Sequence, residues 1–310
     1  MVTGGAGFIG GHITELLVGE GHGVVVFDDF STGDMANLAA VEGRIEVVRG
    51  DIRDARALNV AMAGVDHVIH QAAEISVTRS VEEPSFINEV NVGGTINVLE
   101  AARTNGVQRV VLASSCAVYG DTGSRPQKED FLPQPLSPYG ASKIAGEYYL
   151  SAFYQVYGLQ TVRLRYFNVF GPRQNPKSQY AAAIPIFIER ILTGQGITIY
   201  GDGEQTRDFV YVGNVARANY LATTAPDAAG KVFNVASEQS ISIKELVDRL
   251  VELSGRSVEV KHGEPRVGDI KYSTSDITQA RTVLGYKPLV GFDEGLELTY
   301  RYFAAKAGAV

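Results

Sequence analysis

The chain has 310 residues, and its 28 basic and 35 acidic side chains give a formal net charge of −7 at pH 7. A single cysteine excludes an intrachain disulfide framework and any site built from paired cysteines, and we expect no metal centre. The acidic balance argues against nucleic-acid binding. No apolar run is long enough to cross a membrane, and the N-terminus lacks a signal-peptide pattern, so we expect a cytoplasmic protein without membrane association.

The first half of the chain alternates short apolar runs with amphipathic stretches. The runs that predict buried strands are residues 24–27, 45–48, 67–70, 109–113 and 161–166. Stretches of helical length and spacing are residues 8–20, 86–105 and 139–157. This alternation predicts an α/β fold, a Rossmann-type parallel sheet with helices on both faces. The first strand would hold only residues 1–3, which is short against the usual five or so.

The pattern changes after Asn168. Residues 197–200, 232–235 and 258–261 predict short strands, and residues 184–192 and 243–254 predict helices. Because strands and helices no longer alternate regularly, we expect a smaller mixed α/β lobe. We therefore divide the chain into a first domain, residues 1–167, and a second lobe, residues 168–310. Segments around residues 209–236 are expected to return to the first domain.

Glycines at positions 4, 7 and 10 lie in the motif TGGAGFIG, between the first strand and the first helix. Glycine lets the chain turn tightly there and lets main-chain N–H groups approach a pyrophosphate at the helix N-terminus. Asp28 ends the next predicted strand, where a carboxylate accepts from ribose hydroxyls and repels a 2′-phosphate. The pattern indicates an NAD site. The alternative is a set of turn glycines followed by a solvated pair, Asp28 and Asp29.

Ser115, Tyr139 and Lys143 are the candidate catalytic residues. Ser115 directly follows a predicted strand, at the edge of the sheet where ligands bind in parallel folds. Tyr139 and Lys143 are four residues apart, so they share one face of a helix. Lowering a tyrosine pKa from near 10 to about 7 takes about 4 kcal/mol, which a neighbouring ammonium and a positive nicotinamide ring could supply. Taken singly, these residues are also compatible with an ordinary turn and an ordinary helix pair.

These motifs resemble those of the extended short-chain dehydrogenases/reductases, and among them the UDP-glucose and UDP-N-acetylglucosamine 4-epimerases, over nearly the whole chain. Besides TGGAGFIG, the matching segments are Gly50–Ile52, His70–Ala73, Asn91–Thr95, SSCAVYG, YGASK, Arg163–Asn168, Gly201–Gly203, Arg207–Phe209 and Arg266–Asp269. The resemblance implies that NAD contacts Gly4, Gly7, Phe8, Ile9, Gly10, Asp28, Asp29, Asp51, Ile52, Gln71, Ala72, Ala73, Asn91, Tyr139 and Lys143. It implies that a UDP-sugar contacts Ser76, Cys116, Asn168, Gln174, Ala182, Arg207, Arg266, Asp269 and Ser273.

The residues after Ser115 narrow the reaction that the resemblance implies. The related 4,6-dehydratases carry an acidic pair there, whereas this chain has Cys116 and Ala117, and SSCAVYG also lacks the glutamate of the decarboxylating relatives. A redox-neutral C4 epimerisation through a 4-keto intermediate is therefore expected. Two alternatives stay open: a UDP-glucuronate 4-epimerase, which would need a cation for the sugar carboxylate, and a non-catalytic NAD-sensing module.

The resemblance also bears on substrate range and assembly. We align Ser273, and not Tyr272, with a pocket-wall position at which a large aromatic side chain restricts the family to plain hexoses. A serine there implies that UDP-GlcNAc and UDP-GalNAc are accepted beside UDP-Glc and UDP-Gal, unless Ser273 merely lines a loop. The resemblance further implies a homodimer through helices 86–105 and 139–157, although ordinary core packing would also explain their apolar residues.

Overall fold

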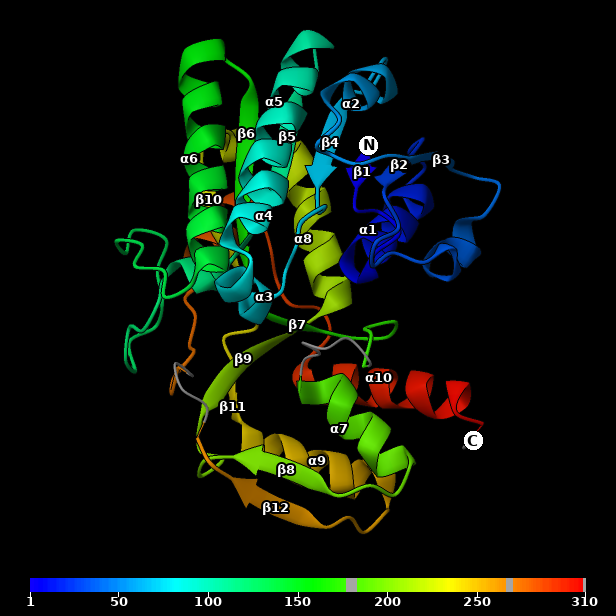
Figure 1. Ribbon diagram of the computed structural model, residues 1–310, viewed down its shortest axis with the longest axis vertical. Coiled ribbons are helices and arrows are strands. Elements are labelled where there is room, and N and C mark those ends of the chain that lie inside the picture. Colours follow the sequence, from blue (N-terminus) through cyan, green and yellow to red (C-terminus); the bar gives the residue numbers. More distant parts are fainter. Residues whose placement is uncertain (177–182, 266–269, 309–310) are drawn as a thin grey trace.

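The computed structural model describes residues 1–176, 183–265 and 270–308, which form a larger and a smaller lobe (Figure 1). The larger lobe is built on a seven-stranded sheet in the order β10-β6-β5-β4-β1-β2-β3, and every neighbouring pair is parallel. Its strands are β1 (Val2–Thr3), β2 (Val25–Asp28), β3 (Glu46–Arg49), β4 (His67–His70), β5 (Arg109–Ser115), β6 (Gln160–Tyr166) and β10 (Val232–Val235). The predicted Rossmann-type α/β fold is confirmed.

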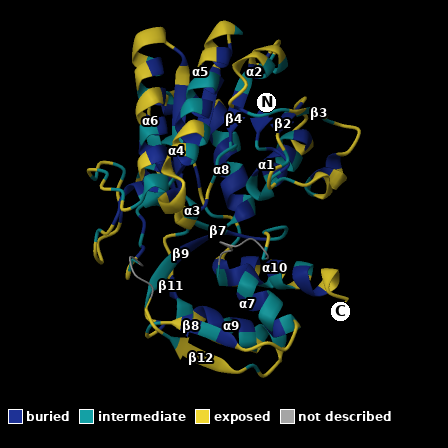
Figure 2. Ribbon diagram, in the orientation of Figure 1, coloured by how far each residue is buried: buried dark blue, intermediate teal, exposed yellow. Residues whose placement is uncertain are grey.

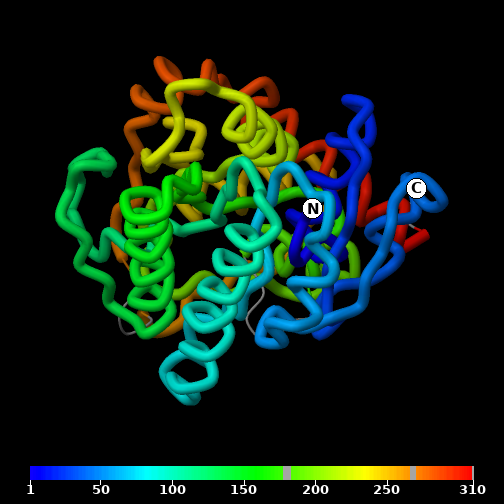
Figure 3. The backbone as a smooth tube through the Cα atoms, turned by 90° about the horizontal axis from the view of Figure 1, so that it is seen from above, coloured from blue at the N-terminus to red at the C-terminus, as the bar shows by residue number. Residues whose placement is uncertain are grey.

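Helices cover both faces of this sheet. On one face α1 (Phe8–Gly19) packs against α8 (Val212–Thr224), and on the other α5 (Gly94–Thr104) lies between α2 (Ala55–Ala61) and α6 (Pro138–Tyr157) (Figures 1 and 3).

Successive side chains of a single strand belong to two separate hydrophobic cores, one on each face of the sheet. In β5, Val111 and Ala113 join the core beneath α1 and α8, while Val110 and Leu112 join the core beneath α5 and α6. Figure 2 shows the strands buried and the outer sides of α5 and α6 exposed. This two-sided burial explains why the strands read as continuous apolar runs.

The helix expected at residues 86–105 is divided. It consists of α4 (Pro84–Asn88), a π-helical segment (Glu89–Gly93) and α5, and the short helix α3 (Val77–Glu82) precedes it. The wider turn accommodates a buried Asn91, whose side chain bonds outside the helix. A continuous apolar periodicity could not reveal this local change of pitch.

Among the described residues, the smaller lobe contains two further sheets and three helices. Strands β7 (Asn168–Phe170), β9 (Thr206–Tyr211) and β11 (Ser240–Ser242) form one sheet, and β8 (Ile197–Tyr200) pairs with β12 (Val260–Gly263) in the other. The helices are α7 (Ala183–Leu192), α9 (Ile243–Ser254) and α10 (Phe292–Lys306). The third core, which includes Phe170, Ile188, Leu246 and Leu296, holds them together.

Short helical segments and the return of the chain complete the fold. The 3₁₀ turns are Met35–Val41, Cys116–Val118 and Pro226–Ala228, and a second π-helical turn is Ala280–Leu284. Strand β10 belongs to the large sheet and helix α8 packs on that sheet, whereas residues 209–211 complete β9 in the smaller lobe. Within the described residues, no helix is long and apolar enough to span a bilayer.

Candidate active site

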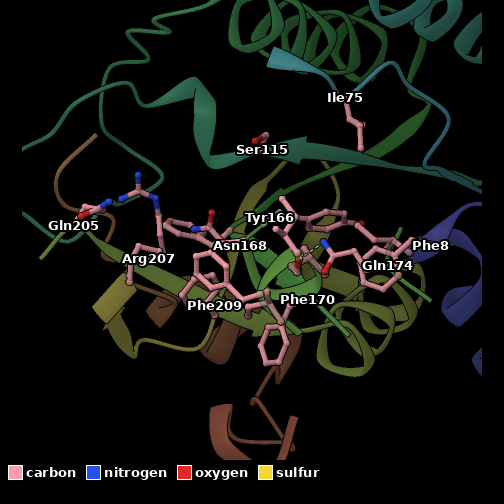
Figure 4. A pocket seen from close by; sticks show the side chains of 18 of the residues that line it. Phe8, Ile75, Ser115, Tyr166, Asn168, Phe170, Gln174, Gln205, Arg207 and Phe209 are labelled. Atoms are coloured by element: carbon pink, nitrogen blue, oxygen red, sulfur yellow. Dashed lines mark hydrogen bonds between the residues drawn. The ribbon is translucent and has the colours of Figure 1, made fainter. Parts of the chain in front are cut away.

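A cavity of about 580 Å³ lies between the two lobes (Figure 4). The larger lobe contributes, among others, Phe8, Ile9, Gln71, Ser115, Tyr139 and Lys143, and the smaller lobe contributes Asn168, Gln174, Phe187, Arg190, Gln205, Arg207 and Phe209. Figure 4 shows Arg207 and Gln205 at one end of the cavity and Phe8 and Gln174 at the other. Ser115 lies on the wall that faces Phe209 and Phe170. This is the crevice beyond the carboxyl ends of the strands, where open parallel sheets bind ligands.

The glycine motif forms a tight turn at one side of the cavity. Gly4 has φ +66°, and a Cβ on it would lie 2.6 Å from the Ala72 nitrogen. A Cβ on Gly10 would lie 2.0 Å from the Gly4 carbonyl oxygen, so no other residue fits there. In the described structure Gly7 is the N-cap of α1 and no side chain caps the helix there, so the first N–H groups of the helix are open to an anion. The turn therefore fits a dinucleotide pyrophosphate.

Asp28 braces this turn from the end of β2. Its Oδ2 accepts from the Ala6 N–H at 2.9 Å, and its Oδ1 accepts from the Phe30 N–H at 2.8 Å. Burial raises the pKa of Asp28, and the two backbone hydrogen bonds oppose that rise. Each carboxylate oxygen has a second lone pair, so a ribose hydroxyl could still donate to Asp28. Asp29 beside it is exposed and accepts from Ser31.

Two further residues expected at the cofactor have partners inside the protein. Arg53 holds both carboxylate oxygens of Asp51 and lowers the pKa of that group. Ile52 is buried against Gly94, where a Cβ would lie 2.4 Å from the Ile52 Cδ1. Neither is among the described residues that line the cavity, so their contact with NAD stays a prediction.

Asn91 holds the segment that follows β4 in place beside α6. Asn91 accepts from the Glu74 N–H at 2.8 Å and donates to the Glu74 carbonyl and the Ser142 Oγ. Ala72 and Ala73 border a small polar cavity that also touches Lys143. Asn91 borders that cavity too, rather than the large one.

The candidate catalytic residues lie together on the cavity wall. Ser115 ends β5, and its hydroxyl hydrogen-bonds the Tyr139 phenol. Tyr139 and Lys143 are on α6, which begins at the N-cap Ser137. The Lys143 Nζ donates to the Ala113 carbonyl at 3.0 Å and lies 5.8 Å from the centre of the Tyr139 ring.

Burial dominates the electrostatics of this group. It raises the pKa of Tyr139 to about 12, although the hydrogen bond from Ser115 opposes the rise. It lowers the pKa of Lys143 to about 8. The expected lowering of the phenol pKa by the lysine is therefore not seen in the protein alone, because both groups lose solvation. The phenol stays protonated at neutral pH unless a further positive charge enters the site.

A buried ion pair behind these residues escaped the sequence analysis. Glu147 is one helical turn beyond Lys143, and its carboxylate accepts from the Arg165 guanidinium at 2.9 and 2.8 Å and from the Ser114 Oγ at 2.5 Å. The Arg165 and Glu147 side chains are 4% and 3% exposed. The pair ties α6 to β5 and β6 next to Ser115. The four-residue spacing of Tyr139, Lys143 and Glu147 was the signal available in the sequence.

Only some of the residues expected at the substrate line the cavity. Asn168 on β7, Gln174 and Arg207 on β9 line the cavity. Ser76 instead caps α3 by accepting from the Arg79 N–H. The residues predicted at the substrate that do not line the cavity within the described chain are Ser76, Cys116 and Ser273. Ala182, Arg266 and Asp269 lie outside the described residues.

Of these residues, Cys116 is half-buried and Ser273 is buried. Burial raises the pKa of the Cys116 thiol to about 11. Ser273 is 6% exposed, and its carbonyl accepts from the Ser240 hydroxyl. Sequence reasoning also missed Phe187 and Arg190 of α7, which line the cavity. Their only signal was the amphipathic pattern of that helix.

Comparison with known proteins identifies the family of the chain. The NAD dependent epimerase/dehydratase family profile matches residues 1–236. UDP-glucose 4-epimerase of Mycolicibacterium smegmatis is 41% identical over 99% of both chains. The structure of Thermus thermophilus UDP-glucose 4-epimerase in complex with NAD has a TM-score of 0.91 at 41% identity, over 100% of this chain and 99% of that one. UDP-N-acetylglucosamine 4-epimerase of Methanobrevibacter ruminantium, in complex with UDP-N-acetylmuramic acid, has a TM-score of 0.94 at 40% identity, over 98% and 97%.

The similarity to solved structures covers both lobes, and the glycine turn, Ser115, Tyr139 and Lys143 lie within the region that the family profile matches. The expectation of an NAD cofactor is confirmed at the level of the family. The chain belongs to the NAD dependent epimerase/dehydratase family.

Proposed function

We propose that the protein interconverts UDP-hexoses that differ in configuration at C4, with NAD as its bound cofactor. The observation that carries the proposal is the meeting of Ser115, Tyr139 and Lys143 on one cavity wall, beside the open N-terminus of α1. The names of its relatives, UDP-glucose and UDP-N-acetylglucosamine 4-epimerase, support the same reaction.

Each residue has a role that follows from its position. Tyr139 takes the proton from the sugar 4-hydroxyl and later returns it, and Ser115 hydrogen-bonds the same oxygen. Lys143 holds its ammonium beside the phenol from the Ala113 carbonyl. Bound NAD supplies a reversible hydride acceptor and the positive charge that the buried phenol lacks. Arg207 and Asn168 anchor the nucleotide while the 4-keto sugar turns to present its other face.

The site disfavours an elimination. A dehydratase needs an acid and a base after the strand-end hydroxyl, and this chain has a neutral thiol and a methyl group at Cys116 and Ala117. A redox-neutral epimerisation needs neither group.

We propose a range that includes N-acetylated sugars, because the family resemblance aligns Ser273 with a position at which a large aromatic side chain would narrow the pocket. Ser273→Tyr should lower the turnover of UDP-GlcNAc and UDP-GalNAc selectively. Tyr272→Ala is the matched control, since Tyr272 is 38% exposed on the neighbouring position. Equal losses on acetylated and plain sugars would contradict the assignment of Ser273. If the substrate range changed only in Tyr272→Ala, the pocket-wall position would be assigned to Tyr272 instead.

One assay separates the proposed activity from its rivals. The purified holoenzyme is incubated with each UDP-hexose, each UDP-N-acetylhexosamine and UDP-glucuronate, and the products are resolved by chromatography. Epimerisation of UDP-glucuronate alone would favour the rival reaction, for which Arg190 offers a cation on the cavity wall. Bound NAD without turnover of any of these sugars would favour a sensing module.

We also propose a homodimer in which helices 86–105 and 139–157 of two copies meet. The exposed large apolar residues in this region are on α6 and α3, and α5 has none within the described chain. Those on α6 are Tyr148, Tyr149, Val156 and Tyr157. The face is therefore centred on α6, with α3 beside it. Elution as a monomer at micromolar concentration would contradict the dimer.

A further inference from the structure

Arg173 adopts an unusual backbone conformation at the junction of the two lobes. It lies three residues after the end of β7 and has φ +71°, one of three positive values at non-glycine positions in the described chain. Such a conformation persists in an arginine only when its surroundings impose it. The side chain is 12% exposed, so the interactions responsible lie within the protein.

Those interactions join the smaller lobe to the cofactor helix. The two terminal nitrogens of Arg173 donate to the two carboxylate oxygens of Glu15 on α1, at 2.6 and 2.8 Å. One of them also donates to the Asn37 carbonyl at 2.7 Å. The planar fork of an arginine suits this arrangement, and the single ammonium of a lysine does not.

The partners of Arg173 reach the glycine turn itself. Asn37 donates from its side chain to the Ala6 carbonyl at 2.8 Å, and the Ala6 N–H donates to Asp28. Glu15 is on α1, which begins at that turn. Arg173 is therefore two hydrogen bonds away from the loop that faces the dinucleotide.

On its other side, Arg173 adjoins the wall of the cavity. Gln174 lines the cavity and donates to the Val169 carbonyl at 3.1 Å. The Pro172 carbonyl lies 3.1 Å from the His12 Nε2 on α1. Burial lowers the pKa of His12 to about 4, so at neutral pH it adds no positive charge beside the arginine. The segment from β7 to Gln174 is thus fixed to the cofactor helix at two consecutive residues.

We propose that Arg173 is a positioning residue that couples the dinucleotide site to the nucleotide-sugar site. A dinucleotide that orders the glycine turn favours the placement of Glu15 and Asn37 that Arg173 needs. The same contact sets the cavity wall at Gln174, so each ligand binds more tightly in the presence of the other. This inference rests on the proposed function, because it takes NAD and a UDP-sugar as the two ligands.

The test uses the holoenzyme and UDP as the probe. Release of NAD is followed after rapid removal of free NAD, with and without saturating UDP, while UDP binding is measured separately. In the unaltered protein we expect UDP to slow release by about fivefold or more. In Arg173→Met, NAD release should be faster. The ratio of the NAD release rate without UDP to the rate with UDP should fall towards one. Arg173→Lys keeps the charge without the fork and should give an intermediate ratio.

Two variants make the result specific. Glu15→Gln should lower the ratio like Arg173→Met, and the double variant should be no worse than Arg173→Met alone. Arg217→Met is the matched control, because Arg217 pairs with Glu20 on the same helix but is 36% exposed. It should keep the ratio of the unaltered protein.

The outcomes separate this inference from the proposed function. Faster release in Arg173→Met with an unchanged ratio would assign the residue a structural role only and overturn the coupling. Binding of UDP without any effect on NAD release in the unaltered protein would overturn it as well. Failure of the unaltered protein to bind UDP would refute the proposed function, and the inference with it.

Discussion

Replacement of Glu147 by glutamine tests whether the buried ion pair with Arg165 keeps Tyr139 and Ser115 in their positions. The carboxylate accepts from Arg165 at two atoms and from Ser114, and both charged side chains are at most 4% exposed. Glutamine keeps one acceptor but turns an NH₂ group towards the guanidinium. Removing one partner of a buried pair costs about 3–5 kcal/mol, because the other charge is left uncompensated.

The size of the effect follows from the length of the chain. An unfolding entropy near 2.1 cal/mol/K per residue gives about 0.65 kcal/mol/K for 310 residues, so the Tm should fall by about 5–8 °C. Glu147 and Tyr139 are on the same helix, and Ser114 precedes Ser115. A misplacement of about 1 Å costs about 100-fold in rate, so we expect kcat to fall by 10- to 100-fold with little change in KM.

The assay combines thermal unfolding with steady-state epimerisation kinetics. Glu147→Leu combined with Arg165→Met removes both charges and should recover most of the stability, but not kcat. Glu20→Gln breaks the exposed pair with Arg217 and should shift the Tm by only about 1 °C. An unchanged Tm in Glu147→Gln, or a double variant as unstable as the single one, would refute the reasoning.

Two further predictions concern the cofactor site and the buried lysine. Gly10→Ala should abolish NAD retention, measured after acid release, because its Cβ would lie 2.0 Å from the Gly4 carbonyl; Gly19→Ala has nothing within 4 Å and should retain the cofactor. The folded-state pKa of Lys143 is about 8 against an ordinary 10.5, so between these values the unfolded chain holds a proton that the folded protein has released. The stability of the cofactor-free protein should therefore rise by about 2 kcal/mol from pH 7.5 to 9.5, and Lys143→Met should lack this rise in denaturant titrations. If the stability of Lys143→Met depended on pH as strongly as that of the unaltered protein, the lowered pKa of the buried Lys143 would be contradicted.

Local patterns in the sequence were sufficient to predict the features that depend on neighbouring residues. The glycine turn, the strand-end Ser115 and the pair of Tyr139 and Lys143 each follow from spacing within one element. The parallel sheet follows from the alternation of apolar runs and helices. These signals are short-range, so a single sequence carries them.

The remaining features depend on residues that are far apart in the chain. The partner of Glu147 is on β6, and the partner of Arg173 is on α1. Charged residues in these positions look like solvated surface groups until the fold buries them. The hydroxyl of Ser76 likewise has a partner that the sequence analysis did not predict, because it caps the short helix α3.

The place of β10 at the edge of the large sheet has a consequence for the order of folding. This strand pairs with β6, and the buried faces of α8 cover α1 and the sheet. Both arrive only after the chain has built β7, α7 and β9. At 5–20 residues per second, the edge of β6 waits about 3–14 s for its partner during synthesis. An uncovered parallel edge invites pairing with other chains, so the nascent protein is most exposed to aggregation in that interval. A fragment that stops at residue 167 would carry this exposed edge permanently.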